Sequence, residues 1–294
     1  MSVQEKKNLE RYKWTLHHPL YWQILMYLLL AVYFLLWILF EAEIRHTVYG
    51  TVLHICIFVP IGVLIAVQMF LEHRGTKTLK NLFKQEISVR EILQIYEELY
   101  AGIDFSKRRH ADTYLDYVLS VAPLYMLIGE FDRAIELYQN LLSTKHKKSV
   151  PKGVHPIICS DLADSFAEKG DAHAAQNAMQ ATLEAVRRQI RRNPKKQAII
   201  EENLNACTRA KLELKCGNPA PMAKIFAEMP APKAQQVPLE QTAVERLRGW
   251  TAYVQGDYAE AQRAYAYVYA HGKDTFYTQE AKYYLNKIRE QNAN

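Results

Sequence analysis

Two long apolar runs dominate the first quarter of the chain. Residues 20–40 are all apolar except Gln23, and none of these 21 residues is charged. A helix of that length measures about 31 Å, which matches a bilayer hydrocarbon core of about 30 Å. A second run of equal length, residues 51–71, also has no charge. The pattern therefore predicts a hairpin of two transmembrane helices within residues 20–72.

Basic residues flank these runs unequally. Four precede the first run, four more stand at positions 74–84 after the second, and only Arg45 lies between them. Positively charged flanks of this kind mark the cytoplasmic ends of membrane helices. We therefore predict an integral membrane protein with a basic tail (residues 1–19), and with its N-terminus and its C-terminal domain in the cytoplasm. The lipid bilayer is then one of its partners.

Helical periodicity returns repeatedly after the second run, and no stretch alternates apolar and polar residues as a strand would. Ser88 and Glu91 have the spacing of a capping box, which predicts a helix over residues 88–101. That helix belongs to a basic segment, residues 73–109, which precedes a repetitive domain at 110–294. The predicted fold class is all-α, with two transmembrane helices followed by helical repeats.

The repetitive domain contains segments that align with one another. Residues 122–142 read APLYMLIGEFDRAIELYQNLL and residues 249–268 read GWTAYVQGDYAEAQRAYAYV, and both carry a glycine followed by an acidic and an aromatic residue. Residues 163–179 and a weaker copy near residue 217 share the glycine and the small residues around it. The four predicted turn glycines are Gly129, Gly170, Gly217 and Gly256.

This pattern resembles the tetratricopeptide repeat, a helix-turn-helix unit of about 34 residues. The resemblance implies an α-solenoid that binds a protein or peptide along a groove and does not act as an enzyme. The third copy departs from the family pattern, because Pro219 replaces the turn aromatic and Glu213 stands where the first helix expects an aromatic residue. The glycine spacings of 41, 47 and 39 residues also exceed the family length.

The resemblance further implies that one face of the first helix of each repeat lines the groove. The residues at these positions do not reproduce the Lys/Asn clamp of the family's chaperone-binding members, so we expect a different ligand. Trp250 has two interpretations, a hot spot in the groove or a core residue packed on the next helix. The candidate groove residues are Asp164, Lys211, Leu214, Arg246, Trp250 and Tyr253.

A basic cluster follows the second repeat. Its spacing places the side chains in adjacent rows of one helix, although Pro194 interrupts the stripe. It is interpreted first as a solvated outer face, then as a site for anionic lipid or an acidic partner, and least as a nucleic-acid site. The residues are Arg187, Arg188, Arg191, Arg192 and Lys195.

The sequence contains no recognised catalytic, nucleotide-binding or metal-binding motif, and none of its four cysteines has zinc-site spacing. We therefore expect no enzymatic activity, no metal and no cofactor, and we expect Cys159, Cys207 and Cys216 on packed helix faces. The leading functional prediction is a membrane-anchored protein-interaction module with a cytoplasmic groove. The alternative is a structural or accessory subunit of a larger membrane complex, for transport or envelope assembly.

Overall fold

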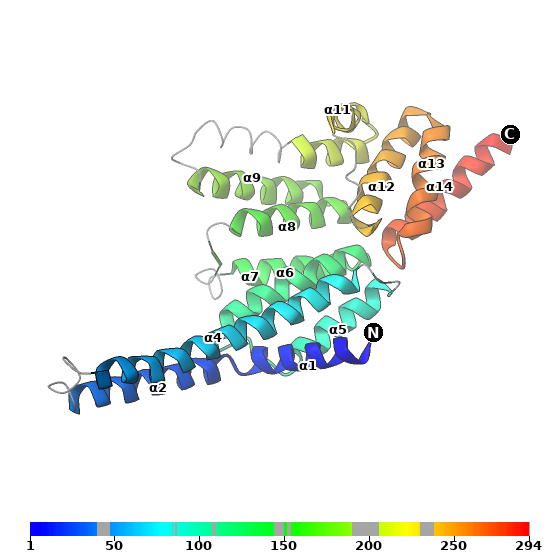
Figure 1. Ribbon diagram of the computed structural model, residues 1–294. Helices are drawn as coiled ribbons and strands as arrows, with labels where there is room; N and C mark the ends of the chain where they lie inside the picture. The colour runs from blue at the N-terminus through cyan, green and yellow to red at the C-terminus, as the bar shows by residue number, and fades with distance from the viewer. Residues whose placement is uncertain are drawn as a thin grey trace. The chain divides into compact units, whose positions relative to one another are not determined.

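The structure is a computed structural model that describes residues 1–39, 48–83, 85, 87–107, 110–143, 150–151, 154–189, 206–229 and 238–293. Over these residues the regular structure is helical and contains no strand (Figure 1). The chain divides into two compact units. One comprises Met1–Leu82 with Glu98–Thr113, and the other comprises Phe83–Glu97 with Tyr114–Asn294. The all-helical content agrees with the predicted class.

The first unit is built on α1 (Val3–His17), α2 (Pro19–Leu39) and α4 (Val48–Leu82). Helix α4 packs against both α1 and α2. Its charged half passes so close to α1 that a β-carbon at Gly75 would overlap the ring of Tyr12. Nearby, the Asn8 side chain donates a hydrogen bond to Thr78 Oγ1 at 3.4 Å. The predicted N-terminal tail is thus largely a helix, which Ser2 and Glu5 begin with a capping box.

The structure contradicts the predicted membrane topology. Among the residues described, no helix combines the length and the apolar character needed to cross a membrane. The predictions of two transmembrane helices and of an integral membrane protein with cytoplasmic N-terminus and C-terminal domain are therefore wrong. Helix α2 follows the first apolar run closely, from Pro19 to Leu39, whereas α4 departs from the second. Helix α4 does not end with its apolar run at Leu71 but continues through Glu72, Arg74 and Lys77 to Leu82.

Large apolar side chains remain exposed on this unit. Several on α2 and α4 have more than half of their surface accessible. Exposed apolar surface of this kind usually marks a site of interaction with another molecule. These side chains include Ile24, Tyr27, Leu28, Phe34 and Leu35 on α2, and Val63, Met69 and Phe70 on α4.

Helical pairs follow one another along the rest of the chain (Figure 1). The helices are α5 (Val89–Tyr100), α6 (Ala111–Leu127), α7 (Phe131–Leu142), α8 (His155–Lys169), α9 (Ala172–Gln189), residues 206–215, α11 (Ala220–Glu228), α12 (Pro238–Gln255), α13 (Tyr258–His271) and α14 (Phe276–Ala293). The predicted start of α5 is confirmed. Ser88 Oγ accepts a hydrogen bond from the Glu91 N–H at 3.1 Å, and Glu91 Oε2 accepts one from the Ser88 N–H at 3.2 Å.

The four predicted turn glycines lie at turns of the same geometry. Each has a left-handed φ between 82° and 92°, a conformation that costs glycine little because it has no β-carbon. Each glycine N–H donates to the carbonyl three residues earlier, at 3.0–3.1 Å. The next N–H donates to the carbonyl five residues earlier, at 2.9 Å in all four turns. This is the Schellman arrangement, which ends one helix and directs the chain into the next.

Small residues lie where the paired helices cross. Ala122, Ala163 and Ala261 are fully buried, and a β-carbon at Gly249 would come within 3.2 Å of the Tyr265 ring. Tyr138 and Tyr265 are also completely buried, and they fill the space that the small residues leave. The small and aromatic positions aligned in the sequence thus form the core of this unit.

Candidate functional site

A group of charged side chains converges from four helices of the second unit. Asp164 and Glu168 come from α8, and Glu280 comes from α14. Lys211 and Lys215 come from the helix of residues 206–215, and Arg246 comes from α12. We call these six residues the charged cluster. Because helical side chains three or four residues apart share a face, each contributing pair points to the same side of its helix.

Arg246 is the centre of the charged cluster. Its side chain is 5% exposed, and its two terminal nitrogens donate to the two carboxylate oxygens of Glu168 at 2.9 and 3.0 Å. Its Nε donates to Glu280 Oε2 at 2.9 Å. The planar guanidinium suits this forked pairing, which a lysine cannot reproduce. One side chain therefore connects α8, α12 and α14.

The electrostatics of the Arg246 pair follow from burial and charge. Burial alone would raise the pKa of Glu168, but the charge and hydrogen bonds of Arg246 lower that pKa to about 2. Burial would likewise lower the pKa of Arg246, whereas Glu168 and Glu280 raise it above its ordinary value. Both partners are therefore charged throughout the physiological range.

Aromatic rings surround the Arg246 guanidinium. Its central carbon lies 4.7 Å from the ring centre of Phe276, 5.0 Å from that of Tyr277 and 5.8 Å from that of Trp250. Contacts of this kind attract a cation to the ring face and also exclude water. They reinforce the ion pairs by holding the guanidinium in one orientation.

The two lysines contact α8 from the neighbouring helix. Lys211 Nζ lies 2.7 Å from Asp164 Oδ2, and these side chains are 23% and 27% exposed. Burial would lower the pKa of Lys211, but Asp164 raises it. Lys215 Nζ donates to the backbone carbonyls of Ala167 and Glu168, the latter at 2.9 Å. It therefore satisfies carbonyl groups at the C-terminal end of α8.

Asp161 lies one turn before Asp164 on α8. Its Oδ2 accepts a hydrogen bond of 3.4 Å from the hydroxyl of the buried Tyr138. Burial raises the pKa of Asp161 to about 6, and the charge of Asp164 acts in the same direction. The Tyr138 hydrogen bond and Lys211 oppose that rise. Asp161 thus holds its proton to a higher pH than an ordinary aspartate does.

The structure separates the candidate groove residues into two groups. Asp164, Lys211 and Arg246 belong to the charged cluster. Leu214 is 1% exposed and packs in a core cluster with Ala210 and Met222. Tyr253 makes edge-to-face contacts with Tyr258 and Tyr284, at 5.7 and 4.8 Å between ring centres. Trp250 contacts Arg246 and is partly buried against two core clusters.

Sequence reasoning missed three members of the charged cluster. Glu168 and Lys215 follow Asp164 and Lys211 by four residues, so extending each predicted face by one turn would have found them. Glu280 had no such signal, because it depends on how α14 packs against α12.

The predicted basic cluster is described only in part. Arg187 and Arg188 lie exposed in the last turn of α9, and Arg188 forms an ion pair with Glu184 at 3.2 Å. The remaining members of the prediction, Arg191, Arg192 and Lys195, lie outside the described residues. The structure thus places two of the five on one exposed helix end.

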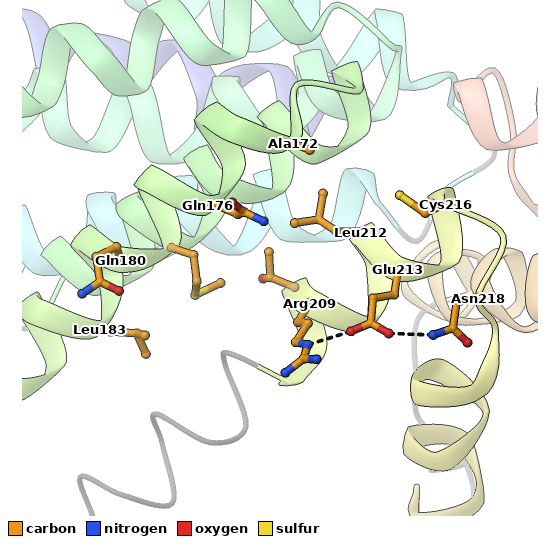
Figure 2. Close-up of a pocket in the computed structure, with 11 residues that line it drawn as sticks. Ala172, Gln176, Gln180, Leu183, Arg209, Leu212, Glu213, Cys216 and Asn218 are labelled. Carbon is orange, nitrogen blue, oxygen red and sulfur yellow. Dashed lines mark hydrogen bonds and ion pairs between the residues drawn. The ribbon is translucent and has the colours of Figure 1, made fainter.

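A cavity of about 640 Å³ lies between α9 and the helix of residues 206–215 (Figure 2). Leu183 and Leu212 contribute apolar surface, and a chain of hydrogen bonds from Arg209 through Glu213 to Asn218 borders it, at 2.6 and 2.8 Å. Cys216 also lines this cavity. Its volume falls in the range of small-molecule sites.

Two of the three cysteine predictions are wrong. Cys159 is buried, but Cys207 and Cys216 are exposed, because the helix of residues 206–215 turns its lysines and Leu214 inward instead. Within the described part of the chain, no group of three or more His, Cys, Asp or Glu side chains has the geometry of a metal site.

Comparisons of the chain with protein-family models, with curated proteins and with solved structures found no match. Functional inference therefore depends on the residues and geometry of this chain itself.

Proposed function

We propose that the second unit is a tetratricopeptide-like interaction module, which binds a segment of another protein over the charged cluster. The observation that carries this proposal is the cluster itself. It brings six ionisable side chains from four helices into a partly exposed site, and Lys211, Asp164, Lys215 and Glu280 retain 20–27% of their side-chain surface. Well-packed apolar side chains would often stabilise such a junction as well or better, so stability alone does not account for it.

The turns support the same proposal. Four helical pairs use the same Schellman geometry at Gly129, Gly170, Gly217 and Gly256. Small residues at each crossing and aromatics between the pairs are the packing expected of tandem helical repeats. In such an array the first helices of successive pairs are neighbours. The charged cluster draws on α8, residues 206–215 and α12, which occupy that position, and on α14, which follows the last pair.

Affinity capture with the full chain tests this proposal. Lys211→Ala removes a cluster cation that contacts Asp164, and partner proteins recovered by the unaltered chain should be reduced about tenfold or more, as for the loss of a hot-spot contact. Arg209→Ala is the matched control, because Arg209 lies on the same helix outside the charged cluster and its exposed side chain forms an ion pair along that helix with Glu213. If Lys211→Ala and Arg209→Ala recovered the partner proteins in equal amounts, the proposal would be refuted.

A second candidate is a subunit of a larger protein assembly, and the exposed apolar side chains of α2 and α4 favour it. Neighbouring proteins would then cover residues such as Leu28 and Phe34. Replacing both by Ser should reduce the mass of the native complex measured by light scattering and leave the helical circular-dichroism spectrum unchanged. An unaltered complex mass would exclude this candidate.

A further inference from the structure

The loop between α13 and α14 contacts the beginning of the second unit. Lys273 Nζ donates to the backbone carbonyl of Gln85 at 2.6 Å. The neighbouring Asp274 accepts hydrogen bonds from the backbone N–H groups of Val89 and Arg90, at 2.5 and 3.1 Å. Two adjacent residues of opposite charge thus bind backbone groups more than 180 positions earlier in the chain.

The contacts of Asp274 and Lys273 each have a physical basis in the local structure. The first N–H groups of α5 have no partner within that helix, and the helix N-terminus attracts an anion, so Asp274 acts as a remote cap. Lys273 has a φ of 53°, and it is the one residue other than glycine with a positive φ in the described structure. A lysine held in this sparsely populated conformation indicates that its contacts constrain the backbone.

The next residues continue from this loop to the charged cluster. The Phe276 ring lies edge-to-face against Phe131 at 5.1 Å, and a β-carbon on Gly129 would lie 3.2 Å from Phe276. Tyr277 lies against Arg246, and Glu280 pairs with it. We call residues 273–280 the clasp, since they connect the start of α5, the α6–α7 turn and the charged cluster.

Release of the clasp would leave Arg246 with one of its two carboxylate partners. Arg246 keeps both of its hydrogen bonds to Glu168 when Glu280 departs. Glu280 Oε1 is buried and has no hydrogen-bond partner in the described residues, so that oxygen would gain water. Breaking a buried ion pair is normally costly because one charge is left unpaired, and that penalty is reduced here.

We infer that the clasp, through Tyr277 and Glu280, is an internal ligand of the other five residues of the charged cluster, and that the partner of the proposed interaction module displaces it. The inference rests on the proposed function. The partner is a helical protein segment with an aromatic side chain three residues before a carboxylate, as Tyr277 stands before Glu280. Its carboxylate takes the place of Glu280 on Arg246, and its aromatic ring takes the place of Tyr277 over the guanidinium.

The charges of the cluster select an acidic partner. Asp164 and Glu168 remain paired with Lys211 and Arg246 after release, so the carboxylate that leaves is that of Glu280. The vacated position then faces Arg246 and the neighbouring Lys215 and is complementary to an anion. A basic segment would meet like charges there and be repelled.

The test uses a fluorescein-labelled peptide of residues 272–291, GKDTFYTQEAKYYLNKIREQ, and measures its binding to the full chain by fluorescence anisotropy. Two variants loosen the clasp independently, the double variant Lys273→Ala with Asp274→Ala, and Glu280→Gln. Both should bind the peptide about tenfold more tightly than the unaltered chain, because the internal competitor is weakened. Lys287→Ala, in an exposed part of α14, is the matched control and should bind as the unaltered chain does.

A second peptide, in which Glu280 is replaced by Gln, should bind at least tenfold more weakly to both loosened variants. The inference is overturned when neither variant gains affinity, when the two peptides bind equally, or when the variants only form dimers that exclude the peptide. Circular dichroism checks folding, and if the double variant does not fold, Glu280→Gln decides. Failure of the proposed function would give a different result. In affinity capture, Lys211→Ala would recover the same partners as the unaltered chain, while in the anisotropy assay the loosened variants would still bind the peptide more tightly.

Discussion

Arg246 and Glu168 form a forked ion pair, with both terminal guanidinium nitrogens within 3.0 Å of the two oxygens of one carboxylate. The two residues are 78 positions apart, and their side chains are 5% and 13% exposed. The pair therefore joins α8 to α12 through charges that water can barely reach. Its consequences for stability can be measured directly.

Removal of Glu168 should destabilise the protein strongly. Glu168→Ala leaves Arg246 buried with Glu280 as its remaining carboxylate partner, and breaking a buried pair in this way costs about 3–5 kcal/mol. Glu184→Ala removes an exposed ion pair on α9 and should cost about 0.5 kcal/mol or less. Urea unfolding of the two variants makes the comparison. Similar midpoints for both would show that the forked pair contributes little.

The Arg246 pair also predicts sensitivity to acid. The pKa of Glu168 is lowered to about 2 in the folded protein, compared with about 4.3 for an ordinary glutamate. A lowered carboxyl pKa contributes stability that is complete above the ordinary value and is lost as the pH falls from about 4.3 toward 2. Thermal melting from pH 5 to pH 2.5 should therefore show a loss of stability that Glu168→Gln reduces. Parallel melting profiles would contradict this assignment.

Asp161 should have the opposite effect on stability to Glu168, because its charged form destabilises the folded protein. Its pKa is raised to about 6 from an ordinary value of about 3.9, so the folded protein holds this proton more tightly than the unfolded chain does. Asp161 therefore destabilises the folded state above pH 6, and the penalty disappears as the pH falls toward 4. Asp161→Asn should raise the free energy of unfolding at pH 7 by about 1–2 kcal/mol.

Melting at two pH values checks the Asp161 prediction. The melting temperature of Asp161→Asn should be higher than that of the unaltered chain at pH 7 and should approach it at pH 4.5. The reason is that Asn cannot ionise and can still accept the Tyr138 hydrogen bond. A variant that is less stable at both values would show that the Asp161 carboxylate is required in its charged form.

Local signals in the sequence predicted local structure well. The capping box of Ser88 and Glu91 and the turn at Gly170 depend on hydrogen bonds between residues at most five positions apart, so the sequence contains all the groups involved. Two other contacts depend instead on packing between helices that are distant in the sequence. One joins Arg246 to Glu168, and the other joins Asp274 to Val89. Those pairings could not be derived from periodicity, which assigns a residue to a face but not to a partner.

The membrane prediction failed for a related reason. The sequence pattern predicts that each apolar run is a complete helix with charged flanks, and α2 does end near the end of its run. In α4 the flank is part of the same helix, and its residues from Glu72 onward continue to pack against α1. The apolar runs predicted α2 and the apolar part of α4, but they did not predict α1, and the end of α4 depends on contacts that composition does not contain.

The turn glycines allow a test that separates backbone strain from packing. Gly170 has a φ of 92° and open space around its α-carbon, so Gly170→Ala introduces strain without a clash. A left-handed alanine should cost about 1–2 kcal/mol. Gly62 lies within α4 and also has open space, so Gly62→Ala should stabilise its helix by about 0.5–1 kcal/mol. Denaturant unfolding should show shifts of opposite sign, and shifts of the same sign would contradict the turn assignment.

Trp250 distinguishes a binding role from a packing role. It is partly buried against two core clusters, one formed by residues 206–215, α11 and α12 and the other by α12, α13 and α14, and its ring lies 5.8 Å from the Arg246 guanidinium. Because it joins two clusters, Trp250→Ala should lower the free energy of unfolding by about 2–3 kcal/mol, less than the loss of a fully buried tryptophan. Trp250→Phe keeps an apolar ring and should recover at least half of that loss. Thermal melting measured together with partner recovery decides between the roles: a Trp250→Ala protein that melts normally but loses its partners would assign this side chain to the binding surface instead of the core.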